Sequence, residues 1–209
     1  MADTSPLRGL AVVLAAYAAG AGWYALTPAT SSPELTGGVL IAFMLPTAAA
    51  AVLWLLHTLE WRRPVCAPEP GDCAATERIV FRIIVFIAGL HGLVLLLVTE
   101  VPWVRHWGLQ LAFLLVGALL VSVGNLLPKT RPNVLVGIRT PRSLRSRRFW
   151  MEINRAGGYV SVALGLVMIV AAVVLGDSLV GRVAGAAVLA AIGILVGRYL
   201  ALVRTSDGV

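Results

Sequence analysis

Long apolar runs alternate with short polar connections along the chain. The runs cover Gly9–Leu26, Gly38–Leu56, Ile79–Val98, Trp107–Leu127, Gly158–Leu175 and Val180–Leu202. Each approaches the roughly 20 residues that a helix needs to cross about 30 Å of hydrocarbon. Because a lone segment in lipid satisfies its backbone only as a helix, the pattern predicts an all-α, polytopic membrane protein with six transmembrane helices in a bundle.

The composition supports this prediction and excludes several classes of protein. Apolar residues make up 59% of the chain and charged residues 13%, about half the share that is typical of soluble domains. The mean hydropathy is +0.89. A soluble enzyme, a DNA-binding domain and a disordered tail are therefore excluded. The first run resembles a signal peptide, but Trp23 and Tyr24 near its end indicate a retained helix with an interfacial anchor.

The positions of the basic residues predict the orientation. The formal net charge is +7, and of the 17 Lys and Arg residues only Arg105 and Arg182 fall on one side of the six runs. The positive-inside rule then places both termini and the long basic loop in the cytoplasm. Because the charge is confined to loops between apolar runs, we expect no direct contact with nucleic acid. Cys66 and Cys73 lie in a cytoplasmic connection without a nearby His, which predicts neither a disulfide nor a metal site.

The sequence offers little support for catalysis or transport. No nucleophile–base pair, paired carboxylate or Gly-rich phosphate loop can be assembled, so we expect no enzyme activity and no cofactor. Two ionisable groups remain, of which His57 lies near the cytoplasmic end of the second run and His91 in the middle of the third. A small transporter that uses His91, Ser122 and Asn125 is the first alternative.

Small residues mark two apolar runs as packing faces. Gly117 and Gly124 are seven residues apart and share one helical face. The last run carries a similar face of Ala186, Ala190, Gly193 and Gly197. Packing within the bundle is the favoured interpretation, and a structural subunit that uses this last face for contact with another protein is the second alternative.

The connection between the fourth and fifth runs has a defined shape. Pro128 ends the fourth helix, Pro132 and Pro141 keep the following chain extended or turned, and Gly137 permits a bend. A loop that serves only to set the topology needs positive charge, but it does not need three prolines and a glycine. The loop is therefore expected to dock against the bundle or a partner.

The second half of this loop predicts a cytoplasmic amphipathic helix between the fourth and fifth spans. At about 100° per residue the basic residues and the apolar residues separate onto two faces. Ser143 or Ser146 would cap its start. Such a helix would lie in the headgroup layer and bind anionic phospholipid. The residues assigned to this lipid-facing helix are Arg145, Arg148, Phe149, Trp150 and Ile153.

The same segment resembles the signature of the SdpI family of bacterial membrane proteins. Twelve positions match from Gly124 to Pro141, and Leu144, Ser146, Trp150, Arg155 and Gly158 extend the match. Asn154 stands where the family usually has His, and the first connection lacks the outer motif of many members. The resemblance implies a signature or partner-binding role for Asn125, Pro128, Lys129, Arg131, Pro132, Asn133, Gly137, Arg139, Thr140, Pro141, Trp150 and Arg155.

The resemblance also implies a domain organisation and a function. Residues 79–209 would form a four-helix membrane domain with the signature loop at 124–158, and residues 1–78 a degenerate two-helix partner module with its connection. The implied function is immunity to a secreted toxic peptide, or membrane signalling, in the bacterial inner membrane. The implied partners are that peptide and a cytoplasmic repressor protein.

Overall fold

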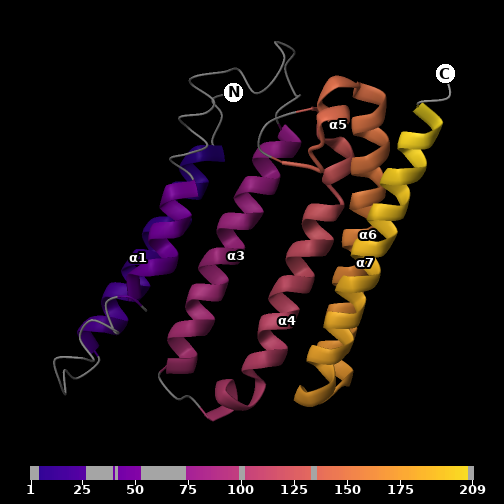
Figure 1. The fold of residues 1–209 in the computed structure, drawn as a ribbon. Coiled ribbons are helices and arrows are strands. Elements are labelled where there is room, and N and C mark those ends of the chain that lie inside the picture. Colours follow the sequence, from indigo (N-terminus) through magenta and orange to yellow (C-terminus); the bar gives the residue numbers. More distant parts are fainter. Residues whose placement is uncertain are drawn as a thin grey trace. The chain divides into compact units, whose positions relative to one another are not determined.

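Every described element of the computed structural model is helical (Figure 1). The structure describes residues 5–26, 40, 42–52, 74–98, 102–132 and 136–206, and no strand occurs in these ranges. The sequence therefore predicted the all-α class correctly.

Five helices are long and apolar enough to cross a membrane. They are α1 (Ser5–Leu26), α3 (Ala74–Val98), α4 (Pro102–Gly124), α6 (Arg147–Val174) and α7 (Asp177–Ser206). The first and third to sixth predicted runs each lie in one of them, apart from a few end residues. The second run, Gly38–Leu56, is described chiefly as a shorter apolar helix at Ala42–Val52. Its remainder falls outside the described residues, so the count of six spans stays a prediction.

The chain divides into two compact units. The first unit contains Met1–Arg63 and Phe81–Leu115, and the second contains Pro64–Val80 and Val116–Val209. The boundary between residues 78 and 79 proposed from the resemblance stays a prediction.

In the first unit, α1 packs closely against the helix at Ala42–Val52. A Cβ at Gly20 would collide with the carbonyl oxygen of Ala42, so only glycine allows this approach. The same Cβ position lies 3.3 Å from Nε2 of His91 on α3. His91 is 1% exposed, and neither of its ring nitrogens has a hydrogen-bond partner among the described residues. This histidine is therefore a buried polar group in an apolar helix.

In the second unit, the end of α4 packs against α6 through two pairs of glycines. A Cβ at Gly124 would lie 2.8 Å from the carbonyl oxygen of Gly158, and a Cβ at Gly117 would lie 2.8 Å from that of Gly165. Conversely, a Cβ at Gly158 would lie 2.6 Å from the carbonyl oxygen of Gly124, and a Cβ at Gly165 would lie 2.6 Å from that of Gly117. The order of the two pairs shows that the helices run antiparallel. The face shared by Gly117 and Gly124 is thus a packing face within the unit, as expected.

The remaining small-residue face is not used in the same way. Ala186, Ala190, Gly193 and Gly197 are all exposed on α7, and no described atom lies within 4 Å of a Cβ added to either glycine. Within the second unit the described residues leave this face open, and its packing inside the bundle stays a prediction. A pattern of small residues marks a surface that permits close approach, but it does not specify the approaching partner.

Candidate functional site

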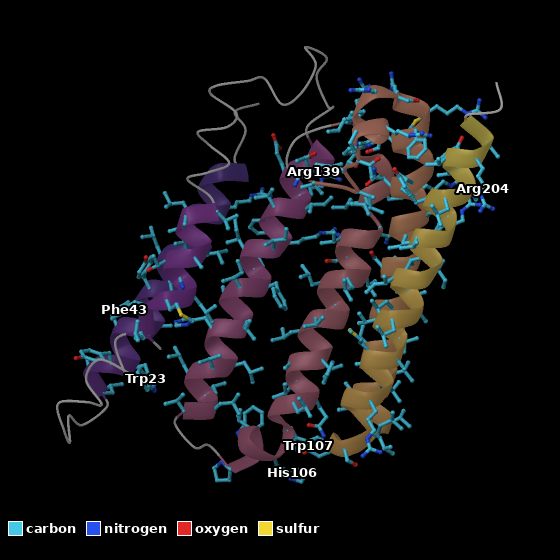
Figure 2. All side chains as sticks on the ribbon, viewed as in Figure 1. Trp23, Phe43, His106, Trp107, Arg139 and Arg204 are labelled. Carbon is cyan, nitrogen blue, oxygen red and sulfur yellow. The ribbon has the colours of Figure 1, made fainter. Side chains whose placement is uncertain are left out.

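The connection between α4 and α6 folds onto the first turns of α6. We call residues 125–132 and 136–158 the platform. It contains the short 3-10 helix η1 (Leu127–Lys129) and the short helix α5 (Pro141–Arg145). Figure 2 shows Arg139 of the platform and Arg204 of α7 at the same end of the second unit.

The platform begins where proline ends α4. Pro128 occupies the start of η1, and its ring lies 2.9 Å from the position of a Cβ at Gly158. Thr130 follows, 3% exposed, and its hydroxyl donates to the carbonyl oxygen of Leu127 at 2.7 Å. Glycine at position 158 therefore admits both the α4 backbone and the proline ring.

Trp150 joins the two ends of the platform. It is fully buried, and its indole Nε1–H donates to the carbonyl oxygen of Thr130 at 2.9 Å. Gly137 lies against the same ring with a φ of +119°. A Cβ at Gly137 would come within 2.8 Å of two ring carbons of Trp150. Only glycine combines this backbone angle with this contact, so the bend expected at Gly137 is present.

Asn154 provides the second attachment. It is fully buried one turn after Trp150, and its Oδ1 accepts a hydrogen bond from the backbone N–H of Ile138 at 2.7 Å. Its Nδ2 donates to the carbonyl oxygen of Trp150 at 3.0 Å. The side chain of Ile138 lies against Gly157, where a Cβ would be 2.6 Å from Ile138 Cδ1. The loop is thus bound to α6 by both polar and apolar contacts.

Reciprocal hydrogen bonds start α5. The Thr140 hydroxyl accepts from the Ser143 N–H at 3.1 Å, and the Ser143 hydroxyl oxygen accepts from the Thr140 N–H at 2.8 Å. Pro141 occupies the first turn, where no backbone donor is needed. Ser146 then caps α6, since its hydroxyl oxygen accepts from the Phe149 N–H at 3.3 Å. Of the two serines considered as caps for the second helix, Ser146 has that role.

The predicted site residues divide into structural and surface positions. Gly137, Thr140 and Trp150 shape the platform, and Pro128, Arg131 and Pro132 are half-buried. Asn133 lies outside the described residues. The exposed members are Asn125, Lys129, Arg139, Pro141 and Arg155.

The predicted lipid-facing helix needs correction. Phe149, Trp150 and Ile153 are 7%, 0% and 1% exposed, so their apolar face contacts protein and not lipid. The ring of Phe149 meets that of Tyr199 on α7 edge-on, at 5.8 Å between centroids. Residues 147–157 are also continuous with the span, since α6 is one helix of 28 residues. Arg145 and Arg148 are exposed as expected. Periodicity identified the apolar face correctly, but the platform loop covers it.

Four residues that organise the platform were not identified as site residues. The sequence marks Asn154 only as a departure from the family pattern and Ser143 only as an alternative cap for the second helix, and it gives no sign of a role for Thr130 or Gly157. The spacing of Thr140, Pro141 and Ser143 is a recognisable cap signal. A single sequence cannot predict that the Thr130 carbonyl accepts from Trp150 or that Ile138 packs on Gly157, because both contacts depend on which segments meet in the fold.

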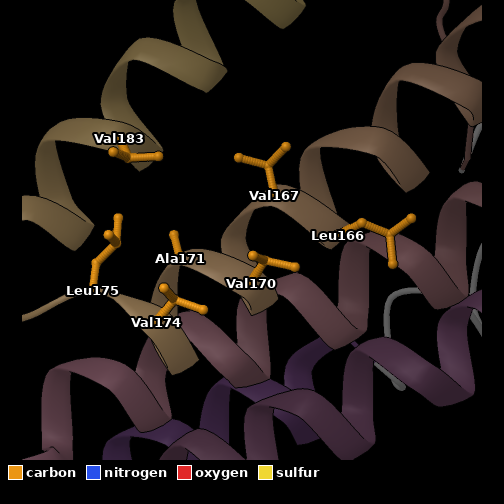
Figure 3. A pocket seen from close by; sticks show the side chains of 7 residues that line it. All are labelled: Leu166, Val167, Val170, Ala171, Val174, Leu175 and Val183. Carbon is orange, nitrogen blue, oxygen red and sulfur yellow. The ribbon is translucent and has the colours of Figure 1, made fainter.

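The second unit also contains an apolar pocket between α6 and α7 (Figure 3). Its volume is about 350 Å³, and its lining is entirely aliphatic: Leu166, Val167, Val170, Ala171, Val174, Leu175 and Val183. Such a lining offers no group for catalysis and no hydrogen bond to orient a polar ligand. The platform therefore remains the stronger candidate site.

The fold defines the class of this protein, a multi-pass helical membrane protein. Residues 129–197 match the family model described as the SdpI/YfhL protein family, which confirms the resemblance over this segment. The matched segment contains most of the platform, all of α6 and most of α7. No curated protein and no solved structure matches the chain.

Proposed function

We propose that this chain is a non-catalytic inner-membrane protein of SdpI type, with a role in toxin-peptide immunity, membrane signalling or both. The platform would face the cytoplasm and act as the output surface. The family match supports the proposal because it includes most of the platform. The distribution of basic residues supports the orientation.

One observation carries the proposal: the platform is a built structure and not a simple basic linker. Trp150 and Asn154, both fully buried, each form a hydrogen bond to its backbone. Arg139, Arg142 and Arg148 are exposed on it. A basic loop that serves topology alone requires no buried hydrogen bonds. Arginines carried on a held backbone instead suit recognition of an acidic partner surface, since the entropy of ordering that backbone is already lost.

The mechanism follows from the continuity of α6. A toxic peptide or a lipid perturbation that shifts α6 against α4 would strain the contact between Gly124 and Gly158. Because α6 extends without a break into the platform, the shift would also move Trp150 and Asn154. The platform would change its docking and present its arginines to a cytoplasmic protein, of which a repressor is the type implied by the resemblance.

The test compares two arginine variants of equal charge. Arg142→Ala removes an exposed arginine of the platform, and Arg182→Ala removes one near the start of α7. Cells that lack the native gene and express each variant are challenged with peptides secreted by their own species, and membrane-recruited proteins are recovered after crosslinking. We expect Arg142→Ala to lose protection or recruitment while Arg182→Ala retains both. Unchanged protection and recruitment in Arg142→Ala at normal expression would refute the proposal.

A second candidate function rests on His91. A buried histidine without a described hydrogen-bond partner is unusual within an apolar helix and suits a proton-coupled transporter. Of the other two residues considered, Ser122 donates to the Leu119 carbonyl at 2.9 Å within its own helix, and Asn125 is exposed in the second unit. Proton flux into vesicles that is lost in His91→Ala and retained in Asn125→Ala would favour transport.

A further inference from the structure

We infer that Arg155 and Tyr159 form a site for the phosphate group of a membrane phospholipid. The inference depends on α6 crossing a bilayer and not on the immunity or signalling role. It specifies, for one pair of residues, the expectation that the protein binds anionic lipid.

One exposed stripe of α6 changes character along its length. Arg148, Glu152, Arg155 and Tyr159 fall within a sector of about 60° at 100° per residue, together with Leu166, Val170 and Val173. Arg148 and Glu152 form an ion pair at 3.1 Å. Tyr159 is 62% exposed, and the three aliphatic residues are 51%, 58% and 69% exposed. The stripe thus passes from charged to aromatic to aliphatic side chains.

This sequence of side chains is what a lipid-facing helix shows at a bilayer surface. Tyrosine is enriched where the headgroups meet the acyl chains, and arginine on the polar side of that level reaches the phosphates. The stripe from Tyr159 to Val173 is about 21 Å long and carries no charge. Arg155, one turn before Tyr159, therefore lies at the level of the headgroups.

The two side chains are already arranged for an anion. Nε of Arg155 donates to the Tyr159 hydroxyl at 3.2 Å, and the guanidinium carbon lies 5.7 Å from the ring centroid. Only Nε is engaged, so the N–H groups of both terminal nitrogens remain to bind phosphate oxygens as a fork. Because the Tyr159 oxygen accepts from Nε, its own hydrogen can donate to the same phosphate. Holding the arginine on the ring lowers the entropy cost of binding.

A lipid is favoured over an acidic protein by the position of the pair. Tyr159 continues directly into the aliphatic part of the stripe, so a ligand above it touches hydrocarbon on its inner side. A phospholipid satisfies both halves of this surface, since its phosphate meets Arg155 and its acyl chains meet Leu166 and Val170. A soluble acidic partner would leave the aliphatic half uncovered.

The test measures lipids retained by the full-length protein. The protein is placed in nanodiscs of phosphatidylcholine alone or mixed with phosphatidylglycerol, and native mass spectrometry counts bound lipids after release. Arg155→Ala and Tyr159→Phe remove the fork and the hydroxyl, and Arg155→Lys keeps the charge without the fork. Arg147→Ala is the matched control, since Arg147 is exposed on α6 outside the stripe. Circular dichroism verifies that each variant is folded.

We expect Arg155→Ala to retain about fivefold less phosphatidylglycerol than wild type, the factor that corresponds to one surface arginine. Tyr159→Phe and Arg155→Lys should show smaller losses. Arg147→Ala should show the smallest loss, because Arg147 lies eight residues farther from the bilayer along α6, about 12 Å and so more than a Debye length. Equal losses in Arg155→Ala and Arg147→Ala would overturn the site in favour of net charge. Unchanged retention in both Arg155→Ala and Tyr159→Phe would also overturn it. Displacement of phosphatidylglycerol by inorganic phosphate would identify free phosphate as the ligand, and Arg155-dependent crosslinking to a protein with unchanged lipid retention would identify a protein surface.

Discussion

Gly124 of α4 and Gly158 of α6 meet backbone against backbone. A Cβ on Gly158 would lie 2.6 Å from the carbonyl oxygen of Gly124, and a Cβ on Gly124 would lie 2.8 Å from that of Gly158. The contact occurs where α4 ends and the platform begins. It therefore fixes both the helix pair and the starting point of the loop.

Replacing Gly158 with Ala should destabilise the protein by about 1–3 kcal/mol, the usual cost of overpacking. The added methyl group would meet the Gly124 carbonyl and the Pro128 ring, and a backbone atom cannot yield as a flexible side chain does. Thermal unfolding in detergent measures the change. Gly193→Ala is the control, since no described atom lies within 4 Å of that Cβ position and alanine favours helix. Equal stability of the two variants would contradict this packing.

Replacing Trp150 with Phe should loosen the platform without unfolding the spans. The variant loses the 2.9 Å hydrogen bond to Thr130, and a buried carbonyl left without its partner costs about 1–3 kcal/mol. Trypsin should then cleave faster after Arg139 and Arg142, which the time course of digestion measures. Trp107→Phe is the control, because Trp107 is 49% exposed at the opposite end of α4, beside His106 (Figure 2). No difference in cleavage between the two variants would count against this role of Trp150.

Alanine at position 137 should cost about 1–3 kcal/mol through backbone strain. The φ of +119° is unfavourable for any residue with a Cβ, and that Cβ would also press on Trp150. We expect faster hydrogen exchange of the Ile138 amide, whose partner is Asn154. In Gly176→Ala, where the Cβ position is open, exchange of Ile138 should stay as in wild type. Slow exchange in both variants would mean that position 137 tolerates a side chain.

Asn154→Asp should weaken the platform by about 1–3 kcal/mol although the side chain keeps its size. The carboxylate can still accept from the Ile138 N–H, but it cannot donate to the Trp150 carbonyl, and a buried charge is unfavourable. Chemical unfolding in detergent quantifies the loss. The same change at exposed Asn125 should have a much smaller effect. If Asn125→Asp proved as harmful as Asn154→Asp, the hydrogen bonds of Asn154 would not explain the result.

The sequence predicted the helices well and their partners poorly. Apolar length placed the cores of α1, α3, α4, α6 and α7 within a few residues, because span length is set by the bilayer. It missed that α6 begins at Arg147 and not at Gly158, since a segment with four charged residues at 147–157 does not resemble a span.

The platform shows the same division. The sequence predicted a helix end at Pro128 and a bend at Gly137, because the backbone conformations open to proline and glycine depend on those residues alone. That Trp150 would bind the Thr130 carbonyl and that Gly124 would meet Gly158 could not be predicted, because both depend on tertiary pairing. An apolar helical face shows that these side chains are buried away from water, but it does not show whether lipid or protein buries them.

Because α6 is unbroken, a substitution within its membrane span can change the position of the platform. Gly165 is 15 residues beyond Trp150 on the same rod, a separation of about 22 Å at 1.5 Å per residue. A bulky side chain at Gly165, within the membrane span, would tilt α6 as a rigid helix and so displace the platform residues at its start. Selections for altered output should therefore recover substitutions in the interior of the span as often as in the loop itself.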